Sequence, residues 1–202
     1  EDSAQTLRLL SSHISRSNAQ FLEFVNDTYF QVTDGFVSED LGKLQKAVTG
    51  LRRERMELKQ TRRKEMLGLR RIDPDVAIEK NTWFHLGINS CEDMLYSLRR
   101  ICDPCVEHID NSFVPLDKER VKEFLPLRDT LLYLLKRVCG VISAGDFTDV
   151  QKLNEQCDAF KHCLSQTRDE QMARMQAGRE NITVSYVYLN ILQETQEMAS
   201  SL

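Results

Sequence analysis

Hydrophobic residues recur at intervals of three and four along most of the chain, the spacing that places side chains on one face of an α-helix. The first such series runs Leu7, Leu10, Ile14, Ser17, Phe21, Phe24, Thr28 and Val32. A later one runs Val150, Leu153, Cys157, Phe160, Leu164 and Thr167. No stretch rich in Val, Ile and Thr alternates in the manner of a β-strand. The pattern therefore predicts an all-α protein.

Capping and turn-forming residues divide this pattern into six helices. The predicted spans are about 4–33, 38–71, 73 to between 102 and 111, 117–145, 147–176 and 181 to the end of the chain. Asp34-Gly35 is predicted to end the first helix, and Ser38 to be the N-cap of the second. Pro126, inside the fourth helix, predicts a kink or a later start.

Six long helices joined by short connections fold most simply as antiparallel neighbours. Helices of roughly 30 residues are about 45 Å long, and 202 residues suffice for one sizeable helical domain or two small ones sharing a core. The sequence therefore predicts two tandem antiparallel three-helix bundles, residues 1–114 and 115–202. The two halves show no obvious sequence identity, so a repeat between them would be structural.

Composition limits the class of protein further. Apolar residues make up 41% and charged residues 29% of the chain, a balance that suits a globular fold and not a disordered one. A net charge of −4 does not indicate nucleic-acid binding. No membrane span or signal peptide is visible, but the chain begins at Glu1 without Met, so we expect it to be a fragment of a longer protein. Six cysteines on predicted helices indicate reduced thiols in a cytosolic compartment.

The stretch CEDMLYSLRRICDPCVEHID, residues 91–110, concentrates residues that could carry chemistry. Within the third helix a heptad seam runs Phe84, Ile88, Cys91, Leu95, Leu98, Cys102, Cys105 and Ile109. Thiols at seam positions are interpreted as core packing, like Cys157 on the fifth helix. The alternative is a zinc site using Cys102, Cys105 and His108, but His108 points aside from the seam and no second pair has ligand spacing.

Acidic residues lie beside this seam. Asp103, Glu107 and Asp110 share one stripe at spacings of four and three. Such a stripe binds a cation if it lines a concave surface, and otherwise is a solvated face. Pro104 cannot donate a backbone hydrogen bond, which predicts a freed carbonyl near Arg100.

The segment IDPDVAIEKNTWFHLGINSCEDMLYSLRRICDPCVEHIDN resembles the third helix of a PhoU-type three-helix repeat. Its run LRRICD, residues 98–103, corresponds to that family's motif Leu-Glu-Arg-Ile-Gly-Asp. More particularly, KNTWFHLGINSCEDMLYSLRRICDPC is similar to the C-terminal PhoU-like domain of bacterial sodium/phosphate cotransporters. The resemblance covers about forty residues, and elsewhere it rests on helix number and order.

This resemblance implies a non-enzymatic regulatory or interaction domain at the cytoplasmic face of the bacterial inner membrane, acting in phosphate uptake or its regulation. The implied partner is the membrane-embedded transporter portion of the same chain, a second copy of this chain is another candidate, and nucleic acid is not expected. No catalytic motif supports an enzyme.

The resemblance also suggests a metal, because some PhoU proteins bind metal clusters through acidic motif residues. Asp103 matches the motif Asp and Arg100 its Arg, whereas Arg99, Cys102 and Pro104 stand where the family has Glu, Gly and His. The alternative function is therefore a metal-binding helical bundle whose acidic ligands come from the third and sixth helices. The candidate ligands are Asp103, Glu107, Asp110 and Glu194.

The second helix is strongly basic, with nine Lys or Arg and three Glu between residues 52 and 71. Clustered cations of this kind favour a lipid surface or an acidic partner. The alternative is a long exposed helix kept soluble by its charges, with local Glu pairs. The candidate contact residues are Arg52, Arg53, Arg62 and Arg63.

Overall fold

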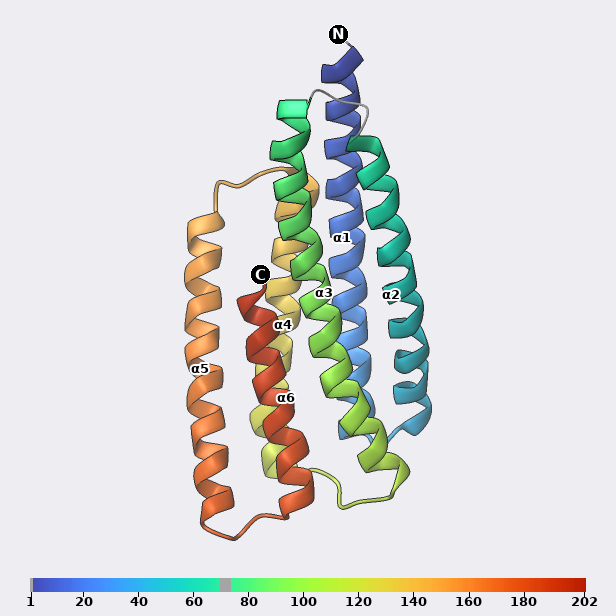
Figure 1. The fold of residues 1–202 in the computed structure, drawn as a ribbon. Coiled ribbons are helices and arrows are strands. Elements are labelled where there is room, and N and C mark those ends of the chain that lie inside the picture. Colours follow the sequence, from blue (N-terminus) through green and yellow to red (C-terminus); the bar gives the residue numbers. More distant parts are fainter. Residues whose placement is uncertain (1, 70–73) are drawn as a thin grey trace.

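In the computed structural model of this protein, the described residues form six helices that follow one another along the chain (Figure 1). The structure describes the backbone of residues 2–69 and 74–202, and the side chains of residues 16–64, 66–68, 74 and 87–202. The helices are α1 (Asp2–Val37), α2 (Leu41–Leu69), α3 (Pro74–Asp110), α4 (Lys118–Ala144), α5 (Val150–Gln176) and α6 (Ile182–Ser200). Over the described backbone there is no strand, which confirms the predicted all-α class.

Successive helices alternate in direction, and α2 and α5 lie at opposite sides of the molecule in Figure 1. Helix α2 packs on α1 and α3, and α5 packs on α4 and α6. Between the two sets of three, α1 packs on α4 and α3 packs on α6. Two of the three pairs of corresponding helices therefore meet, α1 with α4 and α3 with α6. One hydrophobic core runs through all six helices, so the division near residue 114 stays a prediction.

The connection between α1 and α2 differs from the sequence prediction. Helix α1 continues past Asp34 and Gly35 to Val37, so these residues do not end it. A Cβ on Gly35 would lie only 3.0 Å from Leu44 Cγ on α2. A side chain at this position would crowd Leu44 of the neighbouring helix, which is a reason for a glycine inside α1.

The predicted N-cap of α2 was also wrong, by two residues. Asp40 caps the helix, because its Oδ1 accepts a hydrogen bond from the backbone N–H of Lys43 at 3.1 Å. The hydroxyl of Ser38 donates instead to the carbonyl of Asp34, at 2.6 Å. Serine and aspartate are both good N-cap residues. Because α1 continues to Val37, Ser38 bonds back to the end of α1, and Asp40 is the residue that caps α2.

The later helix ends agree better with the prediction. Asp117 caps α4 by accepting from Arg120 N at 2.7 Å, and Asn181 caps α6. Gly145 ends α4 with a positive φ of 64°, a conformation that glycine adopts at little cost. Pro126 lies inside α4, which begins eight residues earlier, so the alternative of a late start was wrong.

The thiols of α3 and α5 lie in the core as predicted, since Cys91, Cys102, Cys105 and Cys157 are all buried. The Cys102 thiol points at the Leu44 carbonyl, with 3.8 Å from sulfur to oxygen. Burial raises the pKa of Cys102 to about 12. The four thiols are therefore packing residues, and burial favours the neutral form of Cys102, Cys105 and Cys157 by raising their pKa values. The side chains of Leu7, Leu10, Ile14 and Phe84, also assigned to the helical faces, lie outside the described residues.

Candidate functional site

The four candidate metal ligands do not lie in one environment. Asp103, Glu107 and Asp110 are exposed on α3, where Asp103 is 3.9 Å from Arg99. Glu194 is buried on α6, and its Oε1 is 2.9 Å from Arg100 Nε. Among the described side chains, no group of three or more His, Cys, Asp or Glu is arranged to hold a metal ion. The metal-binding alternative stays a prediction, which elemental analysis of the purified protein would test.

Arg100 instead belongs to a junction between α3 and α6. Because Pro104 has no N–H, the Arg100 carbonyl lacks its usual helical donor, and the side chain of Asn190 donates to it at 2.7 Å. The Arg100 guanidinium pairs with Glu194 and lies over the Tyr96 ring, 4.5 Å from its centroid. The freed carbonyl was predicted from the sequence, but its partner on the last helix was not. This junction joins the two sets of helices.

A second polar cluster, on α4, α5 and α6, gave no sequence signal. The Tyr188 hydroxyl donates to Glu123 Oε1 at 2.7 Å, and Arg174 Nη2 donates to the same oxygen at 3.0 Å. Burial and then the Glu123 carboxylate raise the pKa of Tyr188 well above its usual range. The acid, the cation and the phenol satisfy one another, so the cluster serves to hold three helices together.

The four basic residues proposed as a contact surface do not form one patch. Arg52, Arg53 and Arg63 are exposed, whereas Arg62 pairs with Glu92 of α3 at 3.0 Å. Consecutive helical residues are turned by about 100°, and Arg53 lines the hollow between α1 and α2. The charges of α2 therefore point in several directions.

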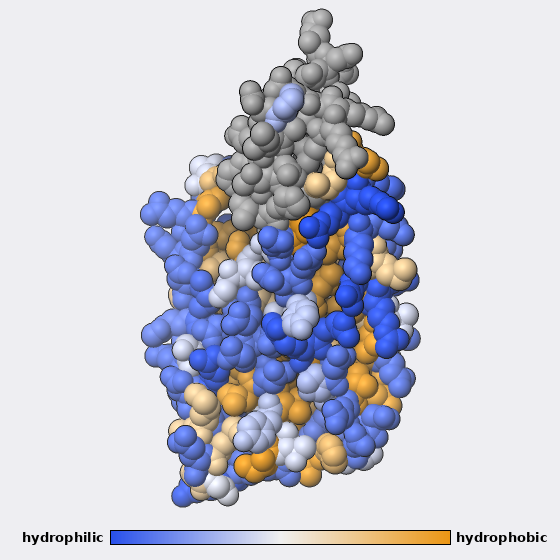
Figure 2. Space-filling view, in the orientation of Figure 1, coloured by the Kyte–Doolittle hydropathy of each residue, from blue (hydrophilic) through white to orange (hydrophobic). Residues whose placement is uncertain are grey.

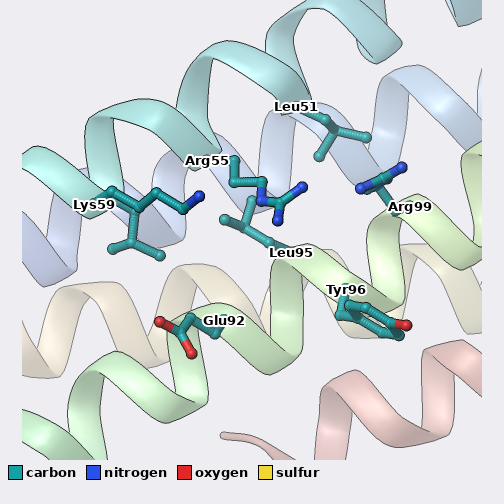
Figure 3. A pocket seen from close by; sticks show the side chains of 8 residues that line it. Leu51, Arg55, Lys59, Glu92, Leu95, Tyr96 and Arg99 are labelled. Atoms are coloured by element: carbon teal, nitrogen blue, oxygen red, sulfur yellow. The ribbon is translucent and has the colours of Figure 1, made fainter.

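Between α2 and α3 lies a surface pocket of about 290 Å³, here called the α2–α3 pocket (Figure 3). Its leucine floor is Leu51, Leu58 and Leu95, and its cationic rim is Arg55, Lys59 and Arg99. Glu92 and Tyr96 complete the lining. Figure 2 shows apolar side chains in orange between the blue side chains of α2 and α3. The pocket thus combines an apolar base with positively charged walls.

The cations of the rim share the region above Leu95 in Figure 3, whereas the Glu92 carboxylate points away from them. Neither Arg55 nor Lys59 forms an ion pair with any residue that the structure describes. Arg99 has only the 3.9 Å contact with Asp103 across exposed surface. Among the described residues, the pocket therefore holds two cations, Arg55 and Lys59, that no carboxylate pairs with.

The amino-acid pattern of α2 explains why the pocket exists. Leu51, Arg55, Leu58 and Arg62 follow one another at spacings of four, three and four, so arginines interrupt a leucine stripe that faces α3. Burying an unpaired guanidinium is costly, so each arginine keeps its charged end at the surface. The helices cannot close over these positions. The sequence showed the two interruptions, and the structure shows the hollow that they leave.

Fold and site together define an all-α six-helix bundle with a cation-lined surface pocket. Comparison with protein-family models, with curated proteins and with solved structures finds no match. None of the helices, over the residues that the structure describes, is both long and apolar enough to cross a membrane.

Proposed function

We propose that this protein is a non-enzymatic regulatory and interaction domain of the PhoU type, serving a sodium-dependent phosphate transporter at the cytoplasmic face of the bacterial inner membrane. The observation that carries the proposal is the packing of corresponding helices, α1 on α4 and α3 on α6. Two copies of one three-helix unit produce this pattern when they pack around an approximate two-fold axis. The resemblance of residues 72–111 to a PhoU-type third helix supplies the family.

The proposed mechanism is contact, because of where the charges lie. Between helices, Glu194 is paired with Arg100 and Glu123 with Arg174, so these groups hold helices together. On α2, exposed cations such as Arg52 and Arg63 are available to an acidic surface. The proposed partner is the membrane-embedded part of the same polypeptide, and the domain biases the state of the transporter by binding it.

The first test is the gene that encodes this chain. The proposal predicts that the same polypeptide contains several apolar segments of about 20 residues, each long enough to span a bilayer. A complete reading frame without such segments would refute the transporter assignment.

The second test is sodium-driven uptake of radioactive phosphate by the complete protein in membrane vesicles. The double variant Arg52→Gln/Arg63→Gln should change the rate of uptake, because it removes two exposed cations from the proposed contact surface. The matched control is Lys122→Gln/Lys136→Gln, which removes two exposed cations from α4 and should leave uptake unchanged. Equal effects of the two double variants would argue against contact through α2.

A further inference from the structure

We propose that the α2–α3 pocket binds a small apolar phosphate monoester. Its phosphate would be held by the cationic rim, and its apolar group would lie on the leucine floor. Two features of the pocket carry this inference: a cationic rim in which Arg55 and Lys59 have no ion-pair partner among the described residues, and a short apolar base.

The charge balance selects the head group. The rim supplies three positive charges, and Glu92 supplies one negative charge that points away from them. The net charge of the lining is therefore +2, from three cations minus one carboxylate. A phosphate monoester carries about −1.5 to −2 at neutral pH, which matches this balance better than a carboxylate does. The guanidinium groups of Arg55 and Arg99 also offer the planar pairs of N–H donors that bind phosphate oxygens well.

The dimensions select a small molecule. The pocket extends along α2 from Leu51 to Lys59, a separation of eight residue steps and therefore about 12 Å. The neighbouring ion pair between Arg62 and Glu92 bridges α2 and α3 beyond Lys59. The volume of about 290 Å³ lies just below the range for ligand pockets, roughly 300–1,000 Å³. A short alkyl chain fits this space, whereas a bilayer surface or a partner helix would need a longer open groove.

The test is titration calorimetry of the purified 202-residue chain with octyl phosphate, at concentrations below micelle formation. We expect binding at least about tenfold tighter than that of inorganic phosphate, because burying a few methylene groups contributes roughly 0.8 kcal/mol each. Affinity should fall as salt is added, because the charges at the rim are exposed. Octyl glucoside, which has the same chain without charge, should not bind.

The variant Arg55→Gln/Lys59→Gln should lower the affinity for octyl phosphate by at least about tenfold, since bonds to charged groups are among the stronger hydrogen bonds. The matched control is Lys46→Gln/Arg53→Gln, which makes the same two exchanges on α2, in the hollow that faces α1. Neither pair carries an ion pair among the described residues, so both variants should fold, as far-UV circular dichroism would verify. Equal affinity of both variants would overturn the proposal.

A second measurement locates the ligand without any variant. On addition of octyl phosphate, the methyl resonances of Leu51, Leu58 and Leu95 should shift in the NMR spectrum. If the largest chemical-shift changes occur at residues outside the α2–α3 pocket, the assignment of the ligand to this pocket is overturned. Sedimentation with phosphatidylcholine vesicles that contain phosphatidic acid tests whether the phosphate group belongs to a membrane lipid instead of a soluble molecule. Binding to these vesicles without binding to octyl phosphate would overturn the small-molecule proposal. All of these measurements use the isolated chain, so their failure would leave the uptake test of the transporter proposal unaffected.

Discussion

Asn190 on α6 and Pro104 in α3 form a pair whose energetic coupling can be measured. In an uninterrupted helix the N–H of residue 104 would bond the carbonyl of Arg100, and proline has no N–H. The Asn190 side chain donates to that carbonyl at 2.7 Å. The substitution Asn190→Ala removes this donor and leaves the carbonyl to solvent alone.

The expected cost depends on residue 104. With Pro104 present, Asn190→Ala should lower the free energy of unfolding by about 1 kcal/mol, since a net hydrogen bond contributes roughly 0.5–1.5 kcal/mol and this one lies near the surface. In the Pro104→Ala background, the new backbone N–H can bond the Arg100 carbonyl. The same Asn190→Ala should then cost less than about 0.5 kcal/mol, the range of ordinary surface substitutions.

The assay is urea unfolding followed by far-UV circular dichroism, on the four proteins of a double-mutant cycle. Asn89→Ala, at an exposed asparagine of α3, is the control for loss of an asparagine side chain and should have little effect in either background. If Asn190→Ala costs the same with and without Pro104, the hydrogen bond does not compensate for the proline, and the reasoning fails.

Two further predictions concern buried groups. The hydroxyls of Tyr29 and Thr195 are buried and 2.8 Å apart. Tyr29→Phe should lower the free energy of unfolding by about 1 kcal/mol. Thr195→Val should lower it by about 2 kcal/mol, because it leaves the tyrosine hydroxyl buried without a partner. Thermal unfolding measures the two losses, since Tm changes by roughly 2–4 °C per kcal/mol. A larger fall in Tm for Tyr29→Phe than for Thr195→Val would contradict the proposed role of the Tyr29–Thr195 hydrogen bond. Burial raises the pKa of Cys102 from about 9 to about 12, so the folded state keeps a proton that the unfolded state releases. Stability should therefore fall as pH rises between these values, by up to about 1.4 kcal/mol per pH unit for this thiol. Urea unfolding at several pH values should show that the free energy of unfolding of Cys102→Ala falls less steeply with pH than that of the unsubstituted protein. An equal dependence on pH in the two proteins would contradict this prediction.

Features of the fold that depend on neighbouring residues could be predicted from the sequence. Asp117 and Asn181 cap α4 and α6 close to where the capping rules place them, because a cap forms within four residues. The first connection was missed because it is decided by contact between helices. Gly35 is inside α1 where Leu44 of α2 comes close, and no local rule contains that distance.

The same limit applies to the candidate site. The arginines that interrupt the leucine stripe of α2 were visible in the sequence, but the α2–α3 pocket also needs Leu95 and Arg99 of α3 at the same height. The partners of Glu123 lie 51 and 65 residues further along the chain, so no periodic pattern relates them. Sequence periodicity predicts which face of a helix is buried, and the relative heights of two helices decide which side chains meet there.

Helix α3 takes part in both the α2–α3 pocket and the junction with α6. One of its faces contributes Leu95, Tyr96 and Arg99 to the α2–α3 pocket. The next residue, Arg100, stacks on Tyr96 and pairs with Glu194 in the junction with α6. Arg99 and Arg100 are adjacent in the same helical turn. If the proposed ligand draws Arg99 towards the pocket, a shift of this turn would also displace Arg100 in the junction. The α2–α3 pocket and the junction between the two sets of helices thus share one turn of α3. Coupling between two such sites requires a shared element with two arrangements whose balance both sites change, and this turn is the element to test.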